Sequence, residues 1–183
     1  MKINTKSGLL ENATQVPSSN FDARPDGRAI SLIVVHNISL PPGEFGGPYI
    51  SQLFTNQLDS EAHPYFAEIH QLNVSSHLLI RRDGEIVQYV PFHCRAWHAG
   101  ASEYCGEECC NDFSIGIELE GTDELPYEPV QYSTLAELII QLRQCYPDIA
   151  KDAITGHCDI APGRKTDPGP AFDWNKLYQL INN

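Results

Sequence analysis

Ala29-Ile30-Ser31-Leu32-Ile33-Val34-Val35 is the segment around which the rest of the chain can be arranged. It is almost continuously apolar and rich in β-branched residues, which is typical of a central strand buried on both faces of a sheet. The strand is expected to end at His36 and Asn37. Residues 39–47 follow, and their prolines and glycines allow neither a helix nor a strand. Because long loops at the ends of buried strands often carry function, we expect functional side chains here.

Further strands are predicted on the C-terminal side of this segment. Ser76 to Ile80 and Glu85 to Val90 have the composition of strands, and the Asp-Gly pair between them is a strong hairpin signal. Phe113 to Glu120 alternates between apolar residues and polar or small ones, so the two faces of this strand should differ. Residues 1–28 are mixed and polar, which predicts an extended arm packed over the core.

Three helices complete the predicted fold. Pro48 can open a short helix at its first position, a longer helix should span residues 129–146, and Asp173 is a good N-cap for the last. Their inward-facing residues are expected to be Ile50, Leu53 and Phe54, then Leu135, Leu138, Ile139 and Leu142, and finally Trp174, Leu177 and Ile181. The elements predict a mixed α/β fold: a single domain over residues 1–183, with a central mixed sheet of about five strands flanked by helices.

The composition argues against several classes of protein. With 12 Lys and Arg against 24 Asp and Glu, the chain has a formal net charge of -12, whereas nucleic-acid binders usually need a basic face. No uncharged apolar run reaches the roughly 18 residues of a membrane span. Lys2 and Lys6 are not followed by the apolar stretch of roughly 7–15 residues that a secretory signal needs. We therefore expect no export signal, no membrane partner and no nucleic-acid partner.

Six cysteines are present, at positions 94, 105, 109, 110, 145 and 158. In a small secreted protein they would suggest disulfides, but without an export signal reduced thiols are the better interpretation. The cluster from Cys105 to Cys110 is also compatible with a soft-metal site. No second cysteine pair stands at zinc-finger spacing, however, which weakens that alternative.

His36, His157 and Asp167 stand out as candidate metal ligands. His36 follows the buried strand, His157 lies in Thr155-Gly156-His157-Cys158-Asp159, and Asp167 lies in a loop rich in proline and glycine. Two imidazoles and one carboxylate suit Zn²⁺ and leave a fourth position open, which is typical of catalytic zinc. The spacing alone leaves another interpretation open, in which the three are a hydrogen-bonded core histidine, a loop histidine and a loop-capping aspartate.

Five short motifs occur in the order Val34-Val35-His36-Asn37, Trp97-His98-Ala99-Gly100, Ser114-Ile115-Gly116-Ile117-Glu118, Gly156-His157 and Lys165-Thr166-Asp167-Pro168-Gly169-Pro170. Together they resemble the AmpD family of N-acetylmuramoyl-L-alanine amidases, which is related to phage lysozyme-type amidases and peptidoglycan recognition proteins. The resemblance covers about residues 15–182. It implies hydrolysis of the amide bond between (1,6-anhydro-)N-acetylmuramic acid and L-alanine, in cytoplasmic peptidoglycan recycling in a bacterium. We expect a monomer whose partner is a small-molecule anhydromuropeptide.

The resemblance also implies roles for five residues. His36, His157 and Asp167 would be the zinc ligands, Glu118 the general base, and Lys165 the group that faces the developing oxyanion. A carboxylate on the polar face of a strand can point into a cleft and pass a proton from water to the leaving nitrogen. Lys165 and Asp167 stand two apart in an extended loop, so both can face the metal. Without the resemblance, Glu118 would be an ordinary strand residue and Lys165 an ordinary surface lysine.

Four further residues are candidates for substrate binding. Trp97 and His98 could line the sugar or peptide groove, and Arg164 could anchor carboxylates of the stem peptide. Asn37, beside a ligand, could bond the substrate amide. A buried tryptophan and a strand-capping asparagine are the alternatives for Trp97 and Asn37.

The sequence departs from the family at two positions, and two other classes of function fit it less well. Asn73 and Cys109 stand where relatives tend to carry basic residues that help to grip the peptide, which leaves peptide affinity open. A non-catalytic peptidoglycan-binding module is disfavoured because the three ligands and both catalytic partners are present. A hydrolase with Cys158 as its nucleophile is disfavoured because the adjacent His157 cannot easily serve as its base.

Overall fold

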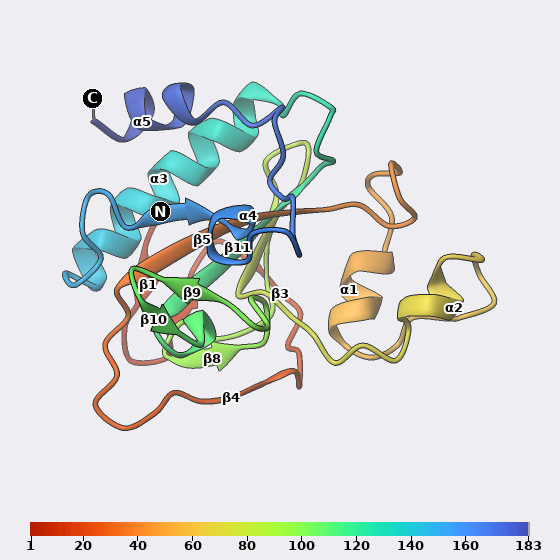
Figure 1. Cartoon of the computed structure of the whole chain (residues 1–183), viewed down its shortest axis with the longest axis horizontal. Coiled ribbons are helices and arrows are strands. Elements are labelled where there is room, and N and C mark those ends of the chain that lie inside the picture. The colour runs from red at the N-terminus through yellow and green to blue at the C-terminus, as the bar shows by residue number, and fades with distance from the viewer. Residues whose placement is uncertain (183) are drawn as a thin grey trace.

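Strand β5, Leu32–Ile38, lies inside a six-stranded mixed sheet in the computed structural model, which describes residues 1–182 (Figure 1). The strand order is β12-β5-β11-β6-β7-β3, and β12, β5, β11 and β6 are parallel to one another. β7 is antiparallel to β6, and β3 is parallel to β7. The other strands are β12 (Ile154–Gly156), β11 (Ser114–Glu120), β6 (Leu78–Ile80), β7 (Ile86–Gln88) and β3 (Thr14–Gln15). The predicted mixed α/β fold is confirmed. The sheet has six strands, because β3 in the arm and β12 before His157 join the four segments named from the sequence.

The central strand begins and ends later than predicted. Leu32, Ile33, Val34 and Val35 are completely buried, as expected of a strand covered on both faces. The strand continues through His36 and Asn37 to Ile38, since its pairing with β11 continues to Glu120. His36 is therefore held inside the sheet by its pairing with Glu118 rather than lying in the following loop.

Strand β11 has the predicted alternation, but its polar face is not exposed to solvent. Ser114, Glu118 and Glu120 are buried like the apolar residues between them. Gly116 lies on the same face, and a Cβ atom there would come within 2.4 Å of the His98 ring. The segment around His98 therefore packs directly on the bare backbone of β11, which explains why the polar face is covered.

The helices cover the sheet as the apolar patterns predict. α3 (Pro129–Cys145) packs against the core, and α5 (Trp174–Asn182) packs on α3 (Figure 1). Asp173 caps α5, because its Oδ1 accepts the backbone N–H of Lys176 at 3.0 Å. The shorter helices are α1 (Tyr49–Phe54), α2 (Phe66–Ile69) and α4 (His157–Ile160). No helix among residues 1–182 is long and apolar enough to cross a membrane.

The arm at the N-terminus lies over the core in four short strands. β1 (Ile3–Asn4) pairs with β2 (Leu9–Leu10), and β4 (Phe21–Ala23) pairs with β8 (Cys94–Ala96). The remaining elements are the hairpin of β9 (Glu103–Tyr104) and β10 (Glu107–Glu108), and the short 3-10 helix η1 (Cys110–Asp112). The Arg24 guanidinium donates to the backbone carbonyls of Phe92, Asn111, Asp112 and Ser114, which fastens the arm to β11 and η1.

Replacement of Leu138 by alanine is expected to lower the free energy of unfolding by about 2–5 kcal/mol, because a fully buried side chain would leave a cavity between α3 and the sheet. Urea denaturation followed by far-UV circular dichroism measures the change. Val130 lies on the same helix but is 40% exposed, so Val130→Ala serves as the control and should change stability much less. Equal losses in the two variants would contradict the assignment of this helix face.

Candidate active site

Several candidate side chains meet at one edge of the sheet, where its parallel strands end. His36 and Glu118 are register partners on β5 and β11, so their side chains leave the sheet on the same face. Gly156 pairs with Val35 at the end of β12, and His157 follows it directly. In open α/β sheets, ligands commonly bind outside the carboxyl ends of the strands. This end of the sheet is therefore where a site is expected.

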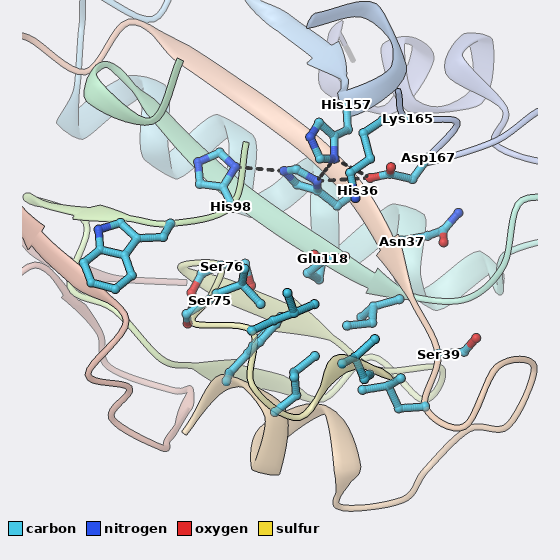
Figure 2. Close-up of a pocket in the computed structure, with 18 of the residues that line it drawn as sticks. His36, Asn37, Ser39, Ser75, Ser76, His98, Glu118, His157, Lys165 and Asp167 are labelled. Atoms are coloured by element: carbon cyan, nitrogen blue, oxygen red, sulfur yellow. Dashed lines mark hydrogen bonds and ion pairs between the residues drawn. The ribbon is translucent and has the colours of Figure 1, made fainter. Parts of the chain in front are cut away.

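A cavity of about 370 Å³ lies at this edge (Figure 2). One side of it is polar and carries His36, Glu118, His157, Lys165 and Asp167. The other side is largely apolar and is formed by α1, α2 and the segments next to them, including Leu40, Leu53, Phe54, Ile69, Leu72 and Val74. The cavity can accommodate a ligand that has both a polar reacting group and an apolar portion.

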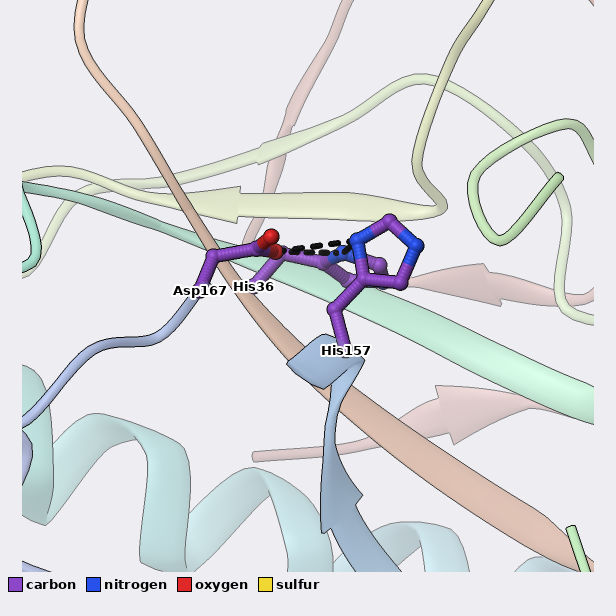
Figure 3. Close-up of side chains that lie close together, drawn as sticks. All are labelled: His36, His157 and Asp167. Carbon is purple, nitrogen blue, oxygen red and sulfur yellow. Dashed lines mark hydrogen bonds and ion pairs between the residues drawn. The ribbon is translucent and has the colours of Figure 1, made fainter. Parts of the chain in front are cut away.

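His36, His157 and Asp167 form a compact group at the polar end of the cavity (Figure 3). The Nδ1 atoms of the two histidines are 3.0 Å apart, and Asp167 Oδ2 lies 3.1 Å and 3.0 Å from them. Tetrahedral zinc with bonds of about 2.0–2.1 Å would require ligand atoms about 3.3–3.4 Å apart, only slightly more than observed. Among residues 1–182, this is the single group of three such donors close enough to share a metal ion.

The protons on the two imidazoles support metal binding. The Nε2 atom of His157 lies 3.0 Å from the carbonyl oxygen of Ala99, which can only accept, so Nε2 carries the proton. The Nε2 atom of His36 is likewise engaged, 2.9 Å from Nδ1 of His98. With Nε2 protonated, each neutral ring presents an unprotonated Nδ1 to Asp167. Three lone pairs then converge with no proton between them, which is the arrangement that a divalent cation satisfies.

The pKa values of these ligands also favour metal binding. Burial lowers the pKa of His36 to about 4, so its ring is neutral near pH 7. Burial opposes ionisation of Asp167, but the neighbouring His157 and His36 side chains outweigh it and hold the pKa of this carboxyl below its usual range. Neutral imidazoles and an ionised carboxylate are the protonation states that zinc requires of its ligands.

Glu118 is the unusual acid of the cavity. It is 8% exposed, and its Oε2 atom is buried with no hydrogen-bond partner among residues 1–182. Burial raises the pKa of Glu118 well above its usual value, the nearby charge of Asp167 raises it further, and Lys165 acts in the opposite direction. A divalent cation at the adjacent ligands would favour the ionised form. A buried carboxylate without partners is poised to exchange protons with a molecule in the cavity.

Residues 26–170 match the N-acetylmuramoyl-L-alanine amidase family. The 1,6-anhydro-N-acetylmuramyl-L-alanine amidase AmpD of Escherichia coli (strain K12) is 64% identical over 177 residues, which cover 97% of this chain and 96% of that protein.

The chain belongs to the AmpD family of N-acetylmuramoyl-L-alanine amidases. A crystal structure of a selenomethionine AmpD derivative matches this amidase with a TM-score of 0.95 and 61% identity, covering 99% of each chain. The E. coli amidase AmiD, in a complex with the substrate anhydro-N-acetylmuramic acid-L-Ala-D-gamma-Glu-L-Lys, matches with a TM-score of 0.62 and 30% identity over 86% of this chain and 60% of that one. The predicted family and the predicted enzyme class are therefore confirmed.

Of the predicted substrate-binding residues of this amidase, three line the cavity. They are Asn37, Trp97 and His98. The Asn37 amide donates to Asp123 Oδ1 at 2.7 Å, which fixes its orientation. Both ring nitrogens of His98 are already engaged, with His36 and with Ser114, so the ring has no nitrogen left for a substrate. Their roles toward substrate stay predictions.

Arg164 and the cysteines are not part of the group of proposed metal ligands. Arg164 is outside the cavity lining, and its guanidinium donates to the carbonyls of Ala99 and Ala101 at 2.5 Å and 2.6 Å. Its predicted role as an anchor for the stem peptide stays a prediction. Burial and the neighbouring Asp159 raise the pKa of the Cys158 thiol, which disfavours a thiolate nucleophile.

Sequence patterns gave no sign of Asn111, which accepts the backbone N–H groups of His98 and Ala99, or of Asp123, which orients Asn37. Side chains that bind backbone groups or position a neighbour follow no periodicity.

Proposed function

We propose that this protein uses zinc to hydrolyse the amide bond between (1,6-anhydro-)N-acetylmuramic acid and L-alanine of muropeptides, in cytoplasmic peptidoglycan recycling. The observation that carries the proposal is the meeting of two imidazole Nδ1 atoms, a carboxylate and a partnerless buried acid in one cavity. The AmiD complex supports the substrate class, since that amidase of the same fold is named with an anhydromuramyl peptide as its substrate.

His36, His157 and Asp167 would hold the zinc ion, through Nδ1, Nδ1 and Oδ2. When bound there, zinc supplies acidification of a water molecule and polarisation of the amide carbonyl. His36 lies on the parallel sheet and His157 directly follows β12, while Asp167 lies in a loop whose backbone carbonyl accepts the N–H of Cys158 at 2.9 Å. Because His36 is a register partner of Glu118, the sheet itself sets the distance between a ligand and the proposed base.

Glu118 would be the general base and then the general acid. Its carboxylate can accept a proton from the attacking water and deliver it to the nitrogen that leaves with L-alanine. The buried, unpartnered Oε2 atom supports this role, because no protein group competes for the proton. Positioned acid–base groups of this kind contribute about 10²–10⁴-fold to a rate.

Lys165 would stabilise the oxyanion that develops on the amide carbonyl. It lines the same cavity as Glu118 and Asp167, and its charge acts on both Glu118 and His36. A cation beside a developing oxyanion lowers the barrier, because its charge is felt more strongly in the transition state than in the neutral amide. Asn37 and Trp97 would contact the muropeptide from the cavity wall.

The cytoplasmic setting and the monomeric state also belong to this proposal. The six cysteines are free thiols, including the neighbouring Cys109 and Cys110, which suits a reducing compartment. Subcellular fractionation and light scattering of the purified protein test these two points independently of the chemistry.

Mass spectrometry of reaction products is the direct test of the reaction. With an anhydromuramyl tripeptide, we expect the free anhydro sugar and the intact peptide, and a reducing muropeptide measures the requirement for the anhydro ring. Prolonged treatment with a zinc chelator at neutral pH should abolish product formation, and added Zn²⁺ should restore it. Full activity in protein shown by elemental analysis to be metal-free would exclude the zinc mechanism, and cleavage at another bond would exclude the proposed specificity.

A further inference from the structure

The segment Trp97–Gly100 contacts both imidazoles of the proposed zinc site, and Asn111 holds this segment. The side-chain Oδ1 of Asn111 accepts the backbone N–H groups of His98, at 3.2 Å, and Ala99, at 2.8 Å. We propose that Asn111 is a positioning residue for the metal site: by fixing these two consecutive residues it places one hydrogen-bond partner for each histidine ligand. The inference rests on the proposed function, because it concerns the proposed zinc ligands.

The contact with His36 runs through the His98 ring. The hydroxyl of Ser114 donates its one proton to the carbonyl of Cys110 at 2.5 Å, so its oxygen accepts from Nε2 of His98 at 3.1 Å. A neutral His98 then has an unprotonated Nδ1, which accepts the Nε2 proton of His36 at 2.9 Å. The direction of this chain is fixed at Ser114, and it leaves Nδ1 of His36 free for the metal.

The contact with His157 runs through the next residue of the same segment. The Ala99 carbonyl accepts the Nε2 proton of His157 at 3.0 Å and also accepts from Arg164 at 2.5 Å. Because the Ala99 N–H is bound by Asn111, both polar groups of this residue are engaged. Ala99 is fully buried, so its carbonyl has no solvent to turn toward.

Close packing makes the segment sensitive to displacement. The His98 ring lies over Gly116, where even a methyl group would come within 2.4 Å of it. A shift of the backbone at residues 98–99 would therefore move the ring against β11 or away from His36. Asn111 itself is outside the cavity lining, and its side chain reaches the zinc site through this segment.

Zinc affinity, measured by competition with a chromophoric chelator, tests the proposal. Asn111→Leu should weaken zinc binding by about 10–100-fold, the usual effect of losing an outer partner of a ligand. Asn111→Asp keeps an oxygen that can accept both N–H groups and should stay within about threefold of the unmodified protein. Asn4→Leu is the matched control, because Asn4 Oδ1 also accepts two backbone N–H groups, of Lys6 and Ser7, but in the β1–β2 turn. This control should bind zinc normally.

Imidazole ¹⁵N NMR of the zinc-loaded protein supplies a second readout that needs no variant. His36, His98 and His157 should each carry a proton on Nε2 alone. A proton on Nδ1 of any of the three would overturn the proposal, as would a folded Asn111→Leu variant with unchanged zinc affinity. If the unmodified protein bound no zinc, the proposed function would fail. The positioning role would then fail with it, whereas a folded Asn111→Leu variant with unchanged zinc affinity overturns the positioning role alone.

Discussion

Asp167→Ala is expected to lower zinc affinity by well over 100-fold and to remove amidase activity with it. Loss of an outer partner of a ligand already costs about 10–100-fold in affinity, and Asp167 would be a ligand itself. It would also be the one anionic ligand, so its removal leaves two neutral imidazoles to hold a divalent cation. Equilibrium dialysis with elemental analysis measures bound zinc, and product analysis on an anhydromuropeptide measures turnover.

The control for this variant is Asp152→Ala, since Asp152 is an exposed acid outside the cavity. It should bind zinc and turn over substrate as the unmodified protein does. Zinc content and turnover should both fall in Asp167→Ala and both stay unchanged in the control. A residue that only supports the fold would lower stability before it lowered zinc content. An Asp167→Ala variant that retained one tightly bound zinc ion per chain would remove this residue from the ligand set.

The architecture was largely predictable because it depends on apolar patterns. The buried run before His36, the stripe of Leu135, Leu138, Ile139 and Leu142 on α3, and the cap at Asp173 all appear where local rules place them. The differences are at boundaries and in two short strands, β3 and β12, that the sequence patterns did not indicate. β5 extends through two polar residues, because β11 supplies hydrogen bonds to them and because a cavity receives the His36 side chain. The periodicity of apolar residues in the sequence indicates neither the pairing with β11 nor the cavity.

The ligand set was not predictable from spacing. His36 and His157 are 121 residues apart, and only the parallel pairing of β12 with β5 brings them together. Resemblance to a family supplied this grouping before the structure did, and the geometry then gave it an independent physical basis in the positions of the ring protons. Neither source indicated the position of Arg164, whose guanidinium binds two carbonyls instead of facing the cavity.

The position of His98 shows why some roles need coordinates. A histidine in a motif next to a tryptophan is compatible with a groove that binds sugar or peptide. In the structure both of its nitrogens are bound, one to His36 and the other to Ser114. The side chain borders the cavity while its polar atoms face the protein, a distinction that sequence cannot make. Its hydrogen bonds connect β11 to β5 across the site.

Glu118→Gln is expected to lower turnover by about 10²–10⁴-fold while zinc affinity stays close to that of the unmodified protein, because the carboxylate is proposed to move protons and not to bind the metal. The amide has nearly the same shape as the carboxyl group, so the cavity keeps its volume. Burying a neutral amide is also less costly than burying a carboxylate that has no partner, so stability should not fall.

The role of Glu118 is identified by measuring zinc binding and turnover separately in each variant. A ligand variant such as Asp167→Ala should lose both properties, whereas Glu118→Gln should lose turnover alone. Glu108→Gln, at an exposed position on β10, controls for the general effect of removing one negative charge and should leave both unchanged. Single-turnover measurements at saturating substrate separate the chemical step from binding. If that step proceeded in Glu118→Gln at close to the normal rate, the proton would have to pass through another group. Apart from the proposed ligands and His98, whose two nitrogens are engaged, the cavity residues with an ionisable side chain are Lys165 and Tyr65.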